Sequence, residues 1–166
     1  MSKVYHRSQR DDWETPPALF NLLDREFAFN LDVCASMHNN KVGRYFGEGG
    51  IAEDGLAAPW QGETCWMNPP YSQTAAWLRK AVVEAATNGA LVVALVAART
   101  DTRAWHADVW PCAAEVRFLK GRVRFVGGAA SAPFPSAIIV FNPRIPRPKA
   151  WGWDWFAAAA QEQADV

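Results

Sequence analysis

The chain has 166 residues, of which 50% are hydrophobic and 20% are charged, and its formal net charge is zero. This length suits one domain with a hydrophobic core, so we expect a single domain over residues 1–166. No apolar run approaches the roughly 20 residues of a membrane span, and the N-terminus contains no apolar signal-peptide core. The sequence therefore excludes a membrane-spanning protein and favours a cytoplasmic one.

The first part of the chain predicts one helix and two short strands. Residues 1–13 are expected to form a polar arm. A hydroxyl residue followed by two prolines, at 15–17, is typical of a helix start, and the apolar spacing behind it predicts a helix of about 12 residues. A buried strand is expected in residues 27–35, ending at Asp32, and a second at residues 64–67, with turn residues between them.

The second part predicts a longer helix and several further elements. After Tyr71 the pattern indicates a helix that begins near Ser72 and stops at Asn88-Gly89. The later elements expected are a buried strand at 90–98, a short helix at 100–110, a hairpin at 115–128, a buried strand at 135–143, a linker at 143–149 and a closing helix within 150–163. This order favours an α/β, three-layer domain with a largely parallel twisted sheet.

Charge is distributed unevenly along the chain. Residues 99–149 contain 9 Lys/Arg against 3 Asp/Glu, a local net charge of +6. Such a basic block can neutralise nucleic-acid phosphates, although an ordinary solvated surface has the same composition, and charge alone favours neither interpretation. The three cysteines and three histidines are far apart in the sequence, so neither a metal site nor a disulfide is expected.

Asn68-Pro69-Pro70-Tyr71 directly follows the strand expected at 64–67. A turn that ends a strand is one interpretation, but ligands of open α/β sheets bind outside the carboxyl ends of the strands. The Asn68 side-chain oxygen and the Pro69 carbonyl are uncharged acceptors. The prolines restrict the backbone between them, and the tyrosine ring can stack on a base. This corner is therefore suited to hold a planar amine by both of its N–H groups.

Holding both N–H groups solves a chemical problem. An aniline-like or amide nitrogen is a poor nucleophile because its lone pair is delocalised. Accepting both N–H bonds favours a more pyramidal, more nucleophilic nitrogen, and the stabilisation grows as charge develops. If the electrophile is a sulfonium methyl, no strong base is needed before the attack, and the proton leaves afterwards.

These residues carry a resemblance. Asn-Pro-Pro-Tyr resembles the catalytic motif of the amino-methyltransferases that use S-adenosyl-L-methionine (SAM). Further similarity to the adenine-specific DNA methyltransferases lies in residues 14–17, 31–36 and 54–60. Together with residues 95–106, 118–125 and 132–141, the order of these segments is similar to that of the phage-type DNA N-6-adenine methyltransferase (phage Dam-like) family.

The resemblance implies a Rossmann-like fold and site-specific transfer of a methyl group to the N6 amine of adenine in double-stranded DNA. It implies that the base is flipped out of the duplex and that no metal takes part. The implied catalytic residues are Asn68, Pro69, Pro70 and Tyr71. The implied cofactor residues are Thr15, Pro16, Asp32, Cys34, Ala35 and Asp54. No acidic residue is found after a second strand to hold the ribose hydroxyls, and Asn40 is the candidate.

The resemblance also implies a DNA-binding set. Its members are Phe125, Arg99, Arg103, Lys120, Arg122 and Arg124. Alternative interpretations are that Phe125 belongs to the core of a hairpin and that Asp101 pairs with Arg103. Because the chain has no room for a separate target-recognition domain, three alternatives stay open: the basic hairpin reads a short site, a second subunit helps, or specificity is low. A monomer or weak homodimer is expected.

The resemblance implies a bacteriophage or prophage protein in the cytoplasm of a bacterial or phage-infected host cell, and a role in restriction-modification. Other acceptors fit the same chemistry: a glutamine side chain of a protein, a cytosine amine, or RNA. A non-catalytic nucleic-acid-binding module with a decayed methyltransferase fold is the alternative from a different class.

Overall fold

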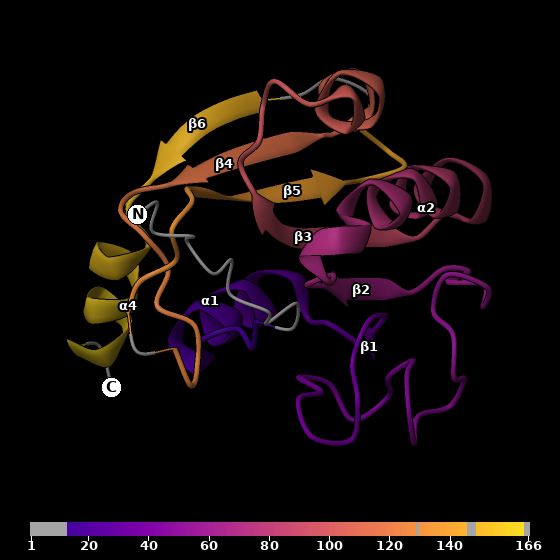
Figure 1. The fold of residues 1–166 in the computed structure, drawn as a ribbon, viewed down its shortest axis with the longest axis horizontal. Coiled ribbons are helices and arrows are strands. Elements are labelled where there is room, and N and C mark those ends of the chain that lie inside the picture. Colours follow the sequence, from indigo (N-terminus) through magenta and orange to yellow (C-terminus); the bar gives the residue numbers. More distant parts are fainter. Residues whose placement is uncertain (1–12, 129, 146–148, 165–166) are drawn as a thin grey trace, which may run out of the picture.

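The computed structural model describes residues 13–128, 130–145 and 149–164, and its centre is a twisted six-stranded sheet in the order β1-β2-β3-β5-β4-β6 (Figure 1). The elements are α1 (Pro17–Phe27), β1 (Leu31–Asp32), β2 (Thr64–Met67), a 3-10 turn (Tyr71–Gln73), α2 (Thr74–Asn88), β3 (Leu91–Ala97), a π-helical turn (Trp105–Val109), α3 (Trp110–Cys112), β4 (Glu115–Leu119), β5 (Ser136–Phe141), β6 (Lys149–Trp153) and α4 (Trp155–Ala164). Only β5 is antiparallel to its neighbours among these strands, so five of the six run in one direction.

The sheet separates two hydrophobic cores. Successive residues of a strand point to opposite faces, and β3 is buried on both. Val92 and Val96 pack in the core that contains Leu78 of α2, whereas Val93 packs in the core that contains Leu23 of α1. Helix α4 covers the same face as α1, and the two helices lie side by side (Figure 1). The predicted α/β class, with helices on both faces, is confirmed.

The strand directions bring four loops together. The carboxyl ends of β1, β2, β3 and β4 lie at one edge of the sheet, because these strands are parallel to one another. The segments that follow them are residues 33–36, 68–73, 98–104 and 120–135. We call this the carboxyl edge. It is where an open α/β sheet binds its ligands.

The helix predicted behind the two prolines is confirmed, with Pro16 as the N-cap residue of α1. The strand predicted at 27–35 is much shorter and contains only the two residues of β1. One reason is that α1 continues to Phe27, the first residue of the expected strand. The helix then ends abruptly, because Ala28 has a left-handed φ of 54° and the Asp24 side chain accepts the Phe29 N–H at 2.9 Å. The longer helix begins at Thr74, after a 3-10 turn, slightly later than expected.

The predicted hairpin at 115–128 is wrong. Strand β4 ends at Leu119, and its two sides are occupied by β5 and β6, so no second hairpin strand can pair with it. Val123 and Phe125 are buried in the core shared with α1 and α4, whereas the arginines beside them are exposed. The alternation of apolar and basic residues therefore arises because an irregular segment packs its apolar side chains on a core; the segment is not a strand.

The end of the chain also differs from the expectation. Lys149, the last residue of the predicted 143–149 linker, begins β6, and residues 146–148 lie outside the described residues, as do residues 1–12 of the predicted arm. The closing helix is confirmed as α4, and the short helix at 100–110 is a π-helical turn followed by α3. Over the described ranges no helix is long and apolar enough to cross a membrane.

Candidate active site

A cavity of about 400 Å³ opens at the carboxyl edge, beside β1 and β2. Of the residues predicted to bind the cofactor, those in its wall are Thr15, Asp32, Cys34, Ala35 and Asp54. Asn68 and Pro70 of the predicted catalytic motif also line it, as does Trp13. Pro16 is not part of the wall. The structure thus brings together in space two sets of residues that are up to 55 positions apart in sequence.

Asp32, the last residue of β1, is 3% exposed. Its carboxylate accepts hydrogen bonds from the backbone N–H groups of Lys41 at 2.9 Å and Cys34 at 3.3 Å. Burial raises the pKa of Asp32 to about 6, because the charged form loses its water, and the two hydrogen bonds and the Lys41 charge only partly oppose this. The cavity therefore contains a carboxyl group that titrates near neutral pH.

A thiol joins the loop after β1 to the motif after β2. The Cys34 Sγ donates to the backbone oxygen of Asn68 at 3.2 Å. Burial, and secondarily the Asp32 carboxylate, raises the pKa of Cys34 well above its usual value. The thiol stays protonated and acts as a hydrogen-bond donor that holds the two loops together.

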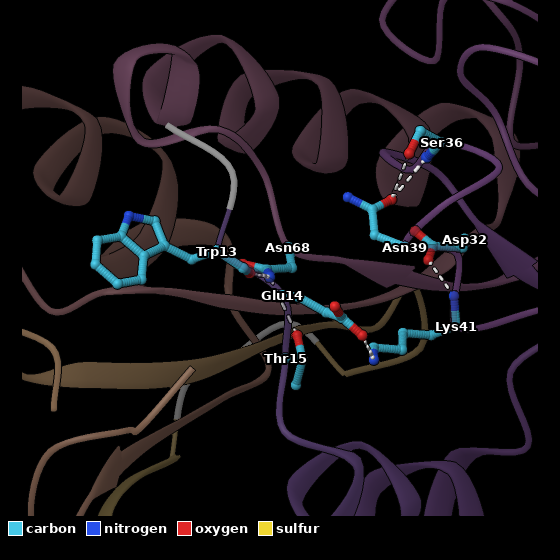
Figure 2. A network of polar contacts seen from close by, with 8 residues as sticks. All are labelled: Trp13, Glu14, Thr15, Asp32, Ser36, Asn39, Lys41 and Asn68. Carbon is cyan, nitrogen blue, oxygen red and sulfur yellow. Dashed lines mark hydrogen bonds and ion pairs between the residues drawn. The ribbon is translucent and has the colours of Figure 1, made fainter. Parts of the chain in front are cut away.

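The Asn68 side chain is held by the segment that precedes α1. Its Nδ2 donates to the backbone oxygen of Trp13 and to the Thr15 hydroxyl at 3.1 Å (Figure 2). No hydrogen bond from any described residue reaches Asn68 Oδ1. The amide is therefore fixed by its nitrogen, and its oxygen is left as an acceptor with no hydrogen bond from the described residues.

Glu14 connects this segment to the rest of the site. Its carboxylate pairs with Lys41 Nζ at 2.8 Å, and both side chains line the cavity (Figure 2). Its backbone oxygen accepts the Val126 N–H at 3.0 Å in an isolated antiparallel bridge. Residues 13–15 are thereby attached both to the loop after β1 and to the loop after β4.

The motif around Asp54 has a structural explanation. Asp54 is exposed at the cavity and its Oδ1 accepts the Leu56 N–H at 2.9 Å. Gly55 follows because a Cβ there would lie 2.0 Å from the Val33 oxygen. The Trp60 indole donates to the Gly55 oxygen at 2.8 Å and fixes the turn. The Asp-Gly-Leu…Trp pattern thus presents one carboxylate to the cavity on a rigid turn.

Among the acidic residues of the cavity wall that the sequence did not single out are Glu48 and Glu53. Tyr45 bridges to Asp32 in parallel, so residues 45–46 extend the sheet beyond β1 by a rudimentary strand. Glu48 follows this segment and lines the cavity, whereas Asn40, the predicted candidate, does not and instead donates to the Val42 oxygen. A one-bridge strand has no periodicity that a sequence could display, which is why the position was not found.

An aromatic cluster lies on the other side of Asn68. Its members are Trp13, Tyr71, Phe125 and Phe134. The Tyr71 and Phe134 ring centroids are 4.7 Å apart, and Trp13 lies 5.4 Å from Phe125 and 6.2 Å from Tyr71. In Figure 2 the Trp13 indole points away from the side of Asn68 on which Asp32 and Ser36 lie. The sequence did not single out Phe134; its only signal is a proline-rich corner.

The cluster is tightly closed. Phe125 is 1% exposed. The Tyr71 hydroxyl is buried and has no hydrogen-bond partner among the described residues, and burial raises the pKa of this phenol above its usual value. A buried hydroxyl without a partner is costly, which makes this ring the least satisfied member of the predicted catalytic motif.

The predicted DNA-binding arginines are exposed around the carboxyl edge. Arg99 and Arg103 follow β3, and Arg122 and Arg124 follow β4. In the described ranges none of these four side chains forms an ion pair. Lys120 also is exposed, but it pairs with Asp154 at 2.8 Å.

One member of the basic block is not at the surface. Arg117 is 5% exposed, and its guanidinium bonds both oxygens of Glu26, with one contact at 2.7 Å, and also Glu115 at 3.0 Å. This network attaches β4 to α1. The local charge of the block is therefore partly structural, and the surface available to phosphates is smaller than the sequence indicated.

These features define an α/β domain with a carboxyl-edge cavity next to an Asn-Pro-Pro-Tyr corner. The family model "DNA N-6-adenine-methyltransferase (Dam)" matches residues 2–148. The chain therefore belongs to this family.

Two curated relatives have the name DNA N-6-adenine-methyltransferase. The protein of Haemophilus phage HP1 is 29% identical over 147 residues, which cover 84% of this chain and 83% of the relative. The protein of Escherichia phage T1 is 26% identical over 114 residues, which cover 67% of this chain but only 45% of the relative.

Proposed function

We propose that the protein is a Rossmann-like, SAM-dependent DNA methyltransferase that acts on the N6 amine of adenine in double-stranded DNA. The observation that carries the proposal is the Asn68 amide, fixed by its nitrogen between a cavity with acidic residues and a cluster of aromatic rings. The names of the two phage relatives support adenine as the base.

The residues of the cavity fit SAM by their chemistry. Asp54, which is exposed at the cavity, would accept a hydrogen bond from an adenine amine, and Glu48, in the same cavity wall, would accept hydrogen bonds from the ribose hydroxyls. Thr15 lies just before the first residues of α1, and a helix N-terminus favours a carboxylate. The Glu14–Lys41 pair offers one charge of each sign to an α-amino acid group. SAM, when bound, supplies a methyl group on a positively charged sulfur.

The chain's own contribution is to hold the amine. Asn68 Oδ1 and the Pro69 carbonyl accept the two N–H groups, which turns the nitrogen lone pair outward toward the cavity. These acceptors are neutral, so they stabilise the positive charge that develops on the nitrogen without taking its proton first. The proton leaves to water after the methyl group has been transferred.

The base has to enter by opening the aromatic cluster. Tyr71 and Phe134, with ring centroids 4.7 Å apart, leave no space for another ring between them. We infer that the flipped adenine separates these rings and stacks on Tyr71. The unpartnered Tyr71 hydroxyl then loses its unfavourable burial. Arg99, Arg103, Arg122 and Arg124 are the exposed cations that would contact the phosphates.

The test is direct. The purified protein is incubated with SAM labelled in its methyl group and unmethylated double-stranded DNA, and the DNA is digested to nucleosides. We expect the label in N6-methyldeoxyadenosine. Asn68→Ala is expected to reduce the rate by about 100-fold or more while calorimetry shows largely unchanged SAM binding. Asn21→Ala, at an exposed position of α1, is the matched control.

Two results would contradict the proposal. Label in a protein amide, with none in DNA, would identify a different acceptor. Absence of both SAM binding and transfer would identify a non-catalytic module, in which case Asn68→Ala would change nothing measurable.

A further inference from the structure

We propose that residues 13–15 orient the catalytic amide: the Trp13 carbonyl and the Thr15 hydroxyl are positioning groups that hold Asn68 Nδ2, so that Oδ1 faces the substrate amine. The inference rests on the proposed function, because it concerns the same site. It assigns to the segment before α1 a role that differs from contact with the cofactor.

An asparagine needs such a device. Its side-chain amide has nearly the same shape when it is rotated by half a turn, but the rotation exchanges an acceptor for two donors. With nitrogen toward the substrate, Asn68 would direct its N–H groups at those of the amine. Something has to distinguish the two orientations.

The Trp13 carbonyl makes this distinction because it can only accept. The Asn68 nitrogen donates to it and, at 3.1 Å, to the Thr15 hydroxyl (Figure 2). A rotated amide would place its oxygen against the carbonyl oxygen of Trp13 and lose that hydrogen bond. Thr15 is only 1% exposed, so water cannot take the place of its hydroxyl as a hydrogen-bond partner of Asn68.

The positioning groups are themselves held on several sides. The Trp13 indole packs against Phe125 in the aromatic cluster. Glu14 is fixed by the Val126 bridge and the Lys41 ion pair. Contacts other than the one to Asn68 therefore hold the segment in place, which is what a positioning element requires.

The chemistry makes position 68 intolerant of aspartate. A carboxylate has no proton to donate to the Trp13 carbonyl, and two acceptors would face each other at short range. A protonated carboxyl, in contrast, can donate to that carbonyl with one oxygen and accept from the amine with the other. An Asn68→Asp enzyme is thus expected to work best when its carboxyl is protonated.

The first experiment measures kcat, the KM for DNA and the Kd for SAM of Thr15→Val, Thr15→Ser and the control Thr87→Val. Valine keeps the shape and removes the hydroxyl; Thr87 is exposed on α2 and donates only within its own helix. We expect Thr15→Val to lower kcat by about tenfold, with a much smaller change in SAM binding. Serine should recover most of this loss. Equal losses for valine and serine, or a loss confined to SAM affinity, would overturn the proposal.

The second experiment records the rate of Asn68→Asp relative to wild type as a function of pH. We expect a loss of about 100-fold at pH 8 that becomes smaller as the pH falls. The charged and titratable groups nearby, Glu14, Asp32, Cys34 and Lys41, are common to both enzymes, so the ratio isolates the effect of the change at position 68. A ratio that does not vary with pH would overturn the proposal.

A third measurement does not depend on activity. In ¹⁵N spectra the Asn68 side-chain NH₂ signals, identified by their loss in Asn68→Asp, should exchange slowly with water and shift in Thr15→Val. Fast exchange would refute the positioning contact even in an enzyme that methylates DNA. Slow exchange in a protein that transfers no methyl group would instead refute only the proposed function.

Discussion

The buried carboxyl of Asp32 should make the stability of the protein depend on pH in an unusual direction. Burial raises its pKa from 3.8 to about 6 in the folded state, so the folded protein binds this proton more tightly than the unfolded chain does. This tighter binding of the proton stabilises the folded protein. The stabilisation is complete below pH 3.8 and is lost as the pH rises through 6. The rise in pKa corresponds to about 3 kcal/mol, since a tenfold change in proton affinity is worth about 1.4 kcal/mol.

The assay is urea unfolding followed by circular dichroism between pH 4 and pH 8. Asp32→Asn cannot ionise, and its oxygen can still accept the Lys41 N–H. Relative to this variant, we expect the wild-type free energy of unfolding to fall by most of the 3 kcal/mol across the window. The exposed Asp101→Asn controls for the loss of one negative charge. If the wild-type and Asp32→Asn curves stay parallel, the Asp32 carboxyl does not bear the cost of burial that the structure indicates.

Two further predictions concern the rim of the site. Arg124→Ala, and separately Arg122→Ala, should weaken DNA binding and each reduce the slope of log affinity against log salt by about 1, with SAM affinity unchanged in calorimetry; an unchanged slope would remove these arginines from the DNA surface. Gly55→Ala places a Cβ 2.0 Å from the Val33 oxygen, so it should cost about 1–3 kcal/mol of stability and weaken SAM binding. Gly43→Ala, where a Cβ meets nothing within 4 Å, is the matched control, and equal melting temperatures for the two variants would contradict the argument.

What the sequence revealed of the site follows from short-range patterns. The buried run at 90–98 and the corner at Asn68 could be assigned because strand length and proline chemistry are local. The rule that ligands bind at the carboxyl ends of parallel strands then placed Asp32 and Asn68 at one edge, and both line the same cavity.

What the sequence did not reveal depends on partners that are far apart. Glu48 reaches the cavity only because residues 45–46 bridge to β1. The contact that fixes Asn68 is made by the backbone oxygen of Trp13, and a backbone group leaves no mark on residue identity. Arg117 looks like its exposed neighbours in the sequence, but Glu26, 91 positions away, makes it a buried link. The hairpin was predicted wrongly for a related reason: the core that buries residues 123 and 125 is formed by distant segments. A segment packed on such a core can bury alternate side chains without being a strand.

The bridge between Glu14 and Val126 has a thermodynamic consequence. The loop that presents Arg122 and Arg124 shares a hydrogen bond with the residue whose carboxylate lines the cavity. We expect a ligand that shifts this loop to shift the cavity wall as well, which would couple the free energies of binding at the two places. Such coupling is reciprocal by necessity. If a ligand in the cavity changes the affinity of the loop for its ligand by some factor, the loop ligand changes the affinity of the cavity by the same factor, whichever of the two binds first.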